Sequence, residues 1–218
     1  MAKRALLLDL GGTVFRSGAE LMADLGEACP ATRAVTARRG PLGPEHDALW
    51  DAMIAEEITE RDYWARRSDE VGAALGRDWP IQEFMHTLWG LSDDLVRPEA
   101  AALVDAARAA GHPVGALTND LRAFHGDGAM STHPLIATFD VLVDGSDTGV
   151  LKPDPRAYAI AVDALGLPAS EIVFVDDMPW NIAGARRAGM IALELDLRNP
   201  GEVFGRAAVE LGLDRSTR

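Results

Sequence analysis

The stretch Arg4-Ala-Leu-Leu-Leu-Asp-Leu-Gly-Gly-Thr-Val-Phe15 decides the fold class of this chain of 218 residues. Its apolar run, residues 5–8, is typical of a strand buried on both faces, and the strand ends at Asp9, just before the flexible pair Gly11 and Gly12. Burying a lone carboxylate is costly, so Asp9 needs a partner or a purpose. In a central parallel strand it would lie at the carboxyl edge of the sheet, where α/β folds bind ligands. The alternative is that Asp9 only caps a turn.

The second half of the chain alternates between strand and helix patterns. Helices are expected at residues 98–110, 155–165 and 201–211, and a further helix after residue 175 that ends at residue 188. Strands are expected at residues 114–118, 139–143, 171–175 and 190–195. Strands separated by helices favour parallel pairing through right-handed crossovers. The sequence therefore predicts an α/β fold with a doubly wound parallel sheet.

Residues 16–95 show helical periods only, at 19–28, 46–57, 61–75 and 81–91, with a loop at 38–44. We expect a catalytic core of residues 1–15 and 96–218, interrupted by a helical-bundle cap of residues 16–95 with hinges near 16–18 and 93–98. The cap holds four of the five tryptophans: Trp50, Trp64, Trp79 and Trp89. They could line a substrate pocket, but aromatic residues at helical spacing favour packing within the bundle.

The composition excludes some classes of partner. The formal net charge of −13 leaves no basic face for a nucleic-acid backbone or an anionic membrane. An acidic protein that handles anions must neutralise them locally, with a metal ion or with placed lysine and asparagine side chains. The single cysteine, Cys29, excludes an internal disulfide. Because no run resembles a signal peptide or a membrane span, we expect a cytoplasmic protein, of undetermined oligomeric state.

Polar residues follow the expected core strands. Asp9 ends the first strand, Thr118-Asn119-Asp120 the second and Asp176-Asp177 the fourth, while Lys152 stands just ahead of a helix. Parallel strands bring these ends to one edge, where converging carboxylates repel each other unless a hard cation such as Mg²⁺ binds. A carboxylate nucleophile, a metal and a lysine together fit phosphoryl transfer.

Four segments in this order resemble the haloacid dehalogenase superfamily of aspartate-nucleophile hydrolases: Asp9-Leu10-Gly11-Gly12-Thr13, Leu117-Thr118-Asn119, Lys152-Pro153-Asp154-Pro155, and Val175-Asp176-Asp177 with Asn181. Residues 138–196 look most like the phosphatase domain of soluble epoxide hydrolases and bacterial sugar phosphatases. The resemblance covers the core, whereas the cap matches only in position and helical character.

The resemblance implies that Asp9 attacks phosphorus and becomes an aspartyl phosphate. Thr118 and Asn119 would hold the phosphoryl oxygens, and Lys152 would neutralise charge beside the nucleophile. The substrate would be a small phosphorylated metabolite.

The resemblance also implies a Mg²⁺ site formed by the Asp9 carboxylate, the Gly11 carbonyl and Asp177. Asp176 would orient Lys152 or a metal-bound water, Asn181 would support this shell from behind, and Thr13 would brace the turn. Each motif has a plainer interpretation: Asp177 as a helix N-cap, Thr118-Asn119 as the start of a turn, and Lys152-Pro153 as a solvated loop. All of these would have to hold together to defeat the catalytic one.

Gly11 departs from the family pattern, because phosphatases of the family usually carry there a second Asp that acts as general acid and base. Its loss removes a contribution of about 10²–10⁴ in rate. The leaving group could depart unaided, a cap histidine (His46 or His86) could substitute, or the protein could bind a phosphorylated ligand without turnover. Some sugar-phosphatase relatives look similar in carrying Gly at this position, which favours hydrolysis.

Other activities remain open. A haloacid dehalogenase would use the same nucleophile without a metal, but such enzymes lack the acid pair Asp176-Asp177. A phosphosugar mutase would need the acid/base that Gly11 lacks. A non-catalytic binding or regulatory protein would release no phosphate from any substrate.

Overall fold

The computed structural model describes residues 3–92, 94–126 and 133–213. The chain divides into two compact units, Met1–Arg16 with Val96–Arg218 (the core unit) and Ser17–Leu95 (the inserted unit). Asp93, in the second expected hinge, lies outside the described residues. Among the described residues, no helix combines the length and the apolar character that crossing a bilayer requires.

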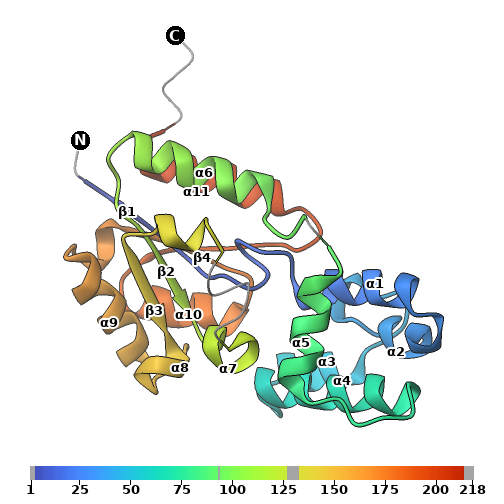
Figure 1. The fold of residues 1–218 in the computed structure, drawn as a ribbon. Coiled ribbons are helices and arrows are strands. Elements are labelled where there is room, and N and C mark those ends of the chain that lie inside the picture. Colours follow the sequence, from blue (N-terminus) through green and yellow to red (C-terminus); the bar gives the residue numbers. More distant parts are fainter. Residues whose placement is uncertain (1–2, 93, 127–132, 214–218) are drawn as a thin grey trace. The chain divides into compact units, whose positions relative to one another are not determined.

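The core unit is built on a parallel sheet, in the order β3-β2-β1-β4-β5 (Figure 1). The strands are β1 (Ala5–Leu8), β2 (Val114–Thr118), β3 (Val141–Asp144), β4 (Ile172–Asp176) and β5 (Ile191–Glu194). The central strand β1 is fully buried, as its continuous apolar run predicts. The N–H of Asp9 donates to the carbonyl of Val175 over 2.9 Å, which places Asp9 at the carboxyl edge of the sheet.

Helices cover both faces of this sheet. Figure 1 shows α6 (Pro98–Ala109) beside α11 (Pro200–Leu211), and on the other face α9 (Pro155–Leu165) and α10 (Pro179–Arg187). Under α9 and α10, Leu7 and Phe174 pack with Tyr158, whose hydroxyl donates to the carbonyl of Asn181 over 2.8 Å. The predicted α/β doubly wound fold is confirmed.

Several short elements of the core unit were not visible as periodic patterns. They are α7 (Leu121–His125), α8 (Gly145–Thr148), and the 3₁₀ turns η3 (Ile136–Thr138) and η4 (Ala169–Glu171). The buried Asp144 joins α7 to α8, because its carboxylate accepts the N–H groups of Arg122 and Ser146, each over 2.9 Å. Such local side-chain hydrogen bonds replace periodicity as the signal for short helices.

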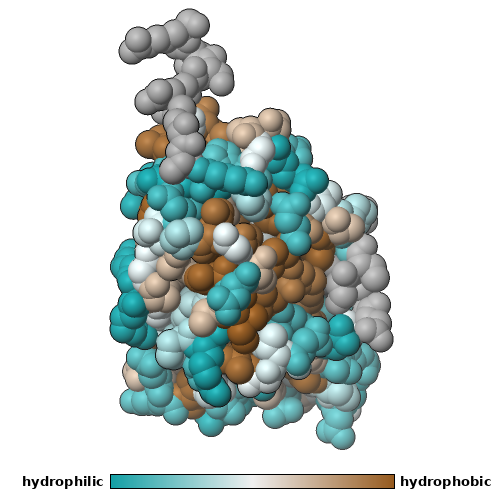
Figure 2. Space-filling model, turned by 90° about the vertical axis from the view of Figure 1, so that its left-hand side faces the viewer, coloured by the Kyte–Doolittle hydropathy of each residue, from teal (hydrophilic) through white to brown (hydrophobic). Residues whose placement is uncertain are grey.

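The sheet ends at β3 with an apolar flank. Figure 2 shows the side of the molecule on which α9 and β3 lie, with hydrophobic atoms gathered in the middle of the face. Leu142 of β3 is 45% exposed, while Val141 of β3 and Val162 of α9 are half-buried and pack against the core that contains Val143. Leu142 alternates with the buried Val143, as the two-residue period of a strand requires.

The inserted unit is a helical bundle. Its elements are α1 (Gly18–Ala28), η1 (Pro30–Thr32), α2 (Arg33–Thr36), η2 (Gly40–Leu42), α3 (Ala48–Ile54), α4 (Glu60–Ala74) and α5 (Ile81–Gly90). Capping boxes begin α1 at Ser17 and α4 at Thr59. The expected helix at 46–57 begins later because Asp47 is its N-cap, and the expected loop at 38–44 contains η2.

The aromatic residues of the inserted unit pack against one another. Trp64 and Trp79 are 8% and 4% exposed, and the rings of Tyr63 and Trp64 meet edge to face with centroids 4.9 Å apart. A side chain at Gly18 would lie 2.2 Å from the Trp64 ring, so only glycine fits there. Trp50 and Trp89 are half-buried. Trp64 and Trp79 therefore contribute to the core of the bundle.

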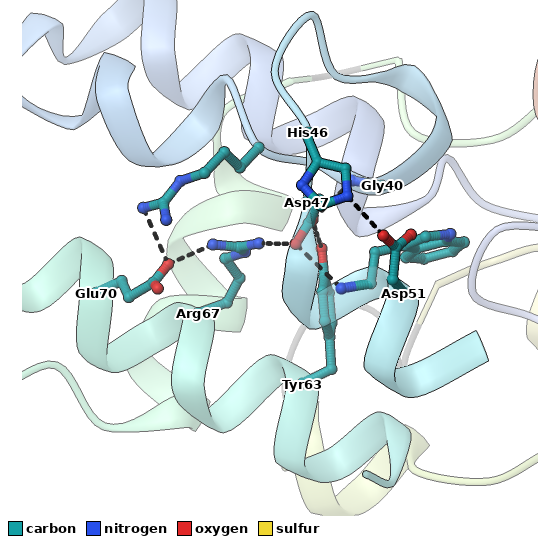
Figure 3. A network of polar contacts seen from close by, with 9 residues as sticks. Gly40, His46, Asp47, Asp51, Tyr63, Arg67 and Glu70 are labelled. Carbon is teal, nitrogen blue, oxygen red and sulfur yellow. Dashed lines mark hydrogen bonds and ion pairs between the residues drawn. The ribbon is translucent and has the colours of Figure 1, made fainter. Parts of the chain in front are cut away.

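A buried ion pair ties the loop before α3 to α4 (Figure 3). The Asp47 carboxylate contacts the guanidinium of Arg67, which is 1% exposed, and accepts hydrogen bonds from Gly40 N (2.9 Å), Trp50 N (3.0 Å) and the Tyr63 hydroxyl (3.0 Å). Burial disfavours the charged carboxylate, but these donors outweigh it and hold the pKa of Asp47 below its usual value. The Asp47 carboxylate, with its ion pair and three hydrogen bonds, thus holds the loop against α4.

We expect Arg67→Met to destabilise the protein by about 3–5 kcal/mol, because it leaves the Asp47 carboxylate buried without its cation. Urea denaturation followed by circular dichroism would measure the loss. Glu83→Gln is the matched control, since it breaks the exposed pair Arg77–Glu83, whose side chains are 49% and 52% exposed, and should change stability little. Equal small losses for both variants would contradict the role of the buried pair.

Candidate active site

The site is centred on Lys152, whose ammonium lies between two carboxylates. Its Nζ is 2.6 Å from Oδ1 of Asp9 and 2.6 Å from Oδ2 of Asp176. The three residues are 4%, 8% and 0% exposed, in the order Lys152, Asp9, Asp176. The structure therefore brings three of the sequence-predicted site residues into direct contact at the carboxyl edge of the sheet.

The Asp176 carboxylate is held by hydrogen bonds from the start of α10. It is the last residue of β4, and its carboxylate accepts hydrogen bonds from Met178 N (2.8 Å) and from Nδ2 of Asn181 (3.1 and 3.2 Å to the two oxygens). Asn181 is itself 2% exposed and lies in the first turns of α10. These bonds fix the carboxylate that orients the Lys152 ammonium.

Asn119 holds the backbone of Lys152. Its Oδ1 accepts the Lys152 N–H over 2.7 Å, and its Nδ2 donates to the Lys152 carbonyl over 3.1 Å. The side-chain amide of Asn119 thus joins the second and third motifs, and the contact of Asn119 with phosphoryl oxygens stays a prediction. Thr118, the last residue of β2, is 6% exposed at the same edge.

Asp177 lies against the turn that follows β1. A Cβ built on Gly12 would be 2.4 Å from Oδ2 of Asp177, and Gly12 has a φ of +82°, so the close approach and the backbone conformation both require glycine. Asp177 is not the N-cap of α10; that position is Met178, which makes no side-chain capping bond. The plainer interpretation of Asp177 as a helix cap is therefore wrong.

The donors around this turn suit a hard divalent cation. Asp9, Asp177 and the main chain of the Gly11–Gly12 turn offer oxygen atoms, the ligands that Mg²⁺ prefers. In the part of the chain that the structure describes, the buried Oγ1 of Thr13 and Oδ1 of Asn181 have no hydrogen-bond partner. No group of three His, Cys, Asp or Glu side chains able to hold a metal is found among the described residues, so two carboxylates with main-chain oxygen are what the site offers.

The charges of the cluster shift its titration. Burial raises the pKa of Asp9, and although the Lys152 ammonium lowers it, the neighbouring Asp176 adds to the rise and the pKa is about 7. Burial disfavours the charged Lys152, but the two carboxylates outweigh this and hold its pKa above the usual value. Lys152 thus keeps its proton while Asp9 titrates near neutrality.

Gly11 leaves open space in the turn that follows Asp9. A Cβ built on Gly11 would meet no atom within 4 Å, and the residue is exposed. The two cap histidines considered as substitutes are surface residues of the inserted unit. His46 is 78% exposed and pairs with Asp51 over 2.7 Å, and His86 is exposed on α5.

Arg97 was missed from the sequence. It is 5% exposed, and its Nε donates to the carbonyl of Gly12 over 3.0 Å, although the two residues are far apart in the chain. The sequence offers no signal for this contact, because Arg97 precedes Pro98 at a helix start and resembles an ordinary surface residue there. Its burial becomes apparent only when the turn after β1 is placed.

Residues 3–189 match a family model described as haloacid dehalogenase-like hydrolase. A phosphatase, MT3486, from Mycobacterium tuberculosis is 33% identical over 134 residues, covering 54% of this chain and 62% of that protein. Validoxylamine A 7'-phosphate phosphatase from Streptomyces hygroscopicus is 31% identical, covering 76% and 79%. (S)-2-haloacid dehalogenase 4A from Burkholderia cepacia is 25% identical, covering 91% and 86%.

Solved structures share the fold. L-2-haloacid dehalogenase from Xanthobacter autotrophicus aligns with a TM-score of 0.58 at 20% identity, covering 88% of this chain and 77% of that one. At this identity the likeness concerns the fold alone.

The pKa of Asp9 predicts how stability depends on pH in the metal-free protein. Between about pH 4 and about pH 7 the folded state holds a proton on Asp9 that the unfolded state has lost, so this contribution to stability falls as the pH rises. For one group the slope approaches about 1.4 kcal/mol per pH unit. Asp9→Asn does not titrate, so its free energy of unfolding should rise relative to that of the wild type across this range.

Urea denaturation in the presence of a chelator would measure both free energies of unfolding at each pH. Parallel curves for the two proteins would show that Asp9 titrates at its usual pKa.

Proposed function

Because the chain belongs to the haloacid dehalogenase-like hydrolase family, we propose that it is a Mg²⁺-dependent phosphatase that hydrolyses a small phosphorylated metabolite through an aspartyl phosphate on Asp9. One observation carries the proposal. Asp9 and Asp176 share the Lys152 ammonium, and Asp177 lies against the turn that follows Asp9, so this edge holds two carboxylates at one ammonium and a third carboxylate beside the turn. A phosphate dianion can enter such a site only if a cation offsets the excess negative charge.

Asp9 is the nucleophile in this proposal. One carboxylate oxygen attacks phosphorus while the bond from phosphorus to the leaving oxygen breaks, and the leaving oxygen departs with the electron pair and takes a proton from solvent. Water then attacks the phosphorus of the aspartyl phosphate. Phosphate leaves, the Asp9 carboxylate is restored, and the attacking water loses its proton to solvent.

Lys152 and Thr118 serve the transferring group. Lys152 is held in place by Asp176 through its ammonium and by Asn119 through its main chain, so its charge is oriented before substrate arrives. Thr118 lies at the end of β2, where its hydroxyl could hold a phosphoryl oxygen. In this proposal the Asn119 side chain positions Lys152, and the Asn119 main chain binds the phosphoryl group.

Asp9, the Gly11 carbonyl and Asp177 would hold Mg²⁺, and Thr13 and Asn181 offer buried oxygens that a hydrated cation could use. When bound, the cation supplies positive charge that offsets the phosphoryl oxygens and favours the ionised form of Asp9. With a pKa of about 7, Asp9 is otherwise only partly ionised at neutral pH.

Gly11 supplies no acid for the leaving group. The proposal therefore favours substrates whose leaving oxygen is a stable anion, such as acyl phosphates, aryl phosphates or anomeric sugar phosphates. Two relatives described as phosphatases, one of which covers most of this chain, support phosphate chemistry. The relative from M. tuberculosis matches over only 62% of its length, so its activity is a guide to the reaction and not to the substrate.

A second candidate is a metal-independent haloacid dehalogenase. The relative from B. cepacia covers 91% of this chain, and such an enzyme also needs no acid at position 11. The pair Asp176-Asp177 favours the phosphatase. Asp176 binds Lys152, and Asp177 lies at the turn where Mg²⁺ would bind, a ligand that a metal-independent enzyme does not need. A non-catalytic phospho-ligand-binding protein is the third possibility.

We also propose that the protein acts in the cytoplasm on a free metabolite and not on nucleic acid or membranes. The net charge of −13 and the single Cys29 support this environment.

We expect phosphate release from p-nitrophenyl phosphate and from members of a sugar phosphate panel to require Mg²⁺ and to vanish in Asp9→Asn, which lacks a nucleophile. Malachite green measures the phosphate. Arg77→Gln on the inserted unit is a control outside the site and should leave turnover unchanged. Halide release from 2-haloacids without metal would favour the dehalogenase. No product from any substrate would favour the non-catalytic binding protein.

We expect Gly11→Asp to raise turnover of alkyl phosphates by about tenfold or more, since the side chain enters open space and supplies the missing acid. Gly11→Asn, of nearly the same shape, should not raise it. Rates for aryl phosphates with acidic leaving groups should change little. Identical rates for the Asp and Asn variants would show that another group already protonates the leaving oxygen.

A further inference from the structure

The turn proposed to bind the metal contains two consecutive glycines, whose backbone dihedral angles are only weakly restricted. Residues 11 and 12 are both glycine, so neither side chain restricts their backbone dihedrals. Gly12 nevertheless adopts a φ of +82° and lies in close contact with the Asp177 carboxylate. Something outside the pair must hold this conformation.

Three hydrogen bonds surround the turn. Asp9 N donates to Val175 O on one side, and Phe15 N donates to Leu10 O across the turn, each over 2.9 Å. The third is the bond from the Arg97 guanidinium, through Nε, to the Gly12 carbonyl at 3.0 Å. The glycine pair is also held by a parallel bridge between Gly11 and Phe15, and the Arg97 bond adds a side-chain donor to Gly12.

Arg97 is also fixed where it stands. Its main-chain N–H donates to the carbonyl of Val14 over 2.9 Å, and Val96 pairs with Phe15 in an antiparallel bridge. Arg97 is 5% exposed, so its bond to Gly12 is shielded from water and gains from the positive charge of the donor. Arg97 thus contacts this segment twice, through its main chain at Val14 and through its side chain at Gly12.

We propose that Arg97 is a positioning residue for the metal-binding turn. By holding the Gly12 carbonyl it fixes the peptide planes of the glycine pair, and with them the Gly11 carbonyl and the contact between Gly12 and Asp177. Arg97 touches neither phosphate nor metal in this role, and it acts through the backbone. The assignment of the turn to Mg²⁺ rests on the proposed function, whereas the ordering of the turn does not.

Two variants test the proposal on the full chain. Arg97→Gln removes the charged donor, and Arg97→Lys keeps a cationic donor. The matched control is Arg4→Gln at the opposite end of β1, where Arg4 pairs with Glu210 over 3.0 Å and Glu171 over 3.4 Å. Circular dichroism and thermal melting establish that each variant folds, and Arg97→Lys carries the test if Arg97→Gln does not.

The first readout is hydrogen exchange of the metal-free protein over residues 9–15. We expect Arg97→Gln to exchange about tenfold faster or more at residues 11–13, Arg97→Lys to fall between it and the wild type, and Arg4→Gln to match the wild type there. Unchanged exchange in a folded Arg97 variant would overturn the proposal. This measurement requires neither metal nor activity, so it remains decisive if the phosphatase assignment fails.

The second readout is Mg²⁺ affinity by titration calorimetry. We expect about 10–100-fold weaker binding in Arg97→Gln, with partial recovery in Arg97→Lys and no change in Arg4→Gln. In steady-state assays at saturating substrate and fixed Mg²⁺, kcat should fall and recover as Mg²⁺ is raised, while the KM for substrate changes little. Normal Mg²⁺ affinity in Arg97→Gln would overturn the metal-site role. A wild type that binds no Mg²⁺ would instead refute the proposed function.

Discussion

The site depends on one arrangement, a buried ammonium shared between two carboxylates. Taking Lys152, Asp9 and Asp176 out of water is expensive, and their mutual attraction offsets that cost only with short contacts and with the remaining polar atoms satisfied. The structure meets the first condition with contacts of 2.6 Å, and it meets the second at Asp176, whose carboxylate also accepts hydrogen bonds from Met178 N and Asn181 Nδ2. The arrangement is asymmetric, because Asp176 accepts hydrogen bonds from Lys152, Met178 and Asn181, whereas the side-chain donor to Asp9 is Lys152. Asp176 is therefore the more firmly held of the two carboxylates.

The sheet explains how distant residues reach this ammonium. Asp9 follows β1, Asp176 ends β4 and Asn119 follows β2, and parallel pairing around β1 brings their carboxyl ends together. These placements were predictable from sequence, because apolar runs of strand length followed by polar residues leave few alternatives in an α/β fold. The long helices were predictable too, since their apolar periods and the glycines after them are visible in the chain.

What escaped prediction was local or long-range hydrogen bonding. Asp144 begins short helices through its carboxylate, and Arg97 reaches Gly12 across most of a hundred residues, yet neither contact has a periodic signature. The bonds between the Asn119 amide and the Lys152 main chain were also not predicted. Residue type and spacing indicate which groups meet, but the pairing of individual donors and acceptors follows from the folded backbone.

The bridge between Phe15 and Val96 has a consequence for how such a chain can evolve. The polypeptide leaves the core unit and returns to it at neighbouring points that the core itself ties together. An insertion at this junction can be lengthened, trimmed or traded for another without altering the sheet register or the edge that carries Asp9. Exchange of the insertion at this junction thus leaves the folding of the parent sheet undisturbed.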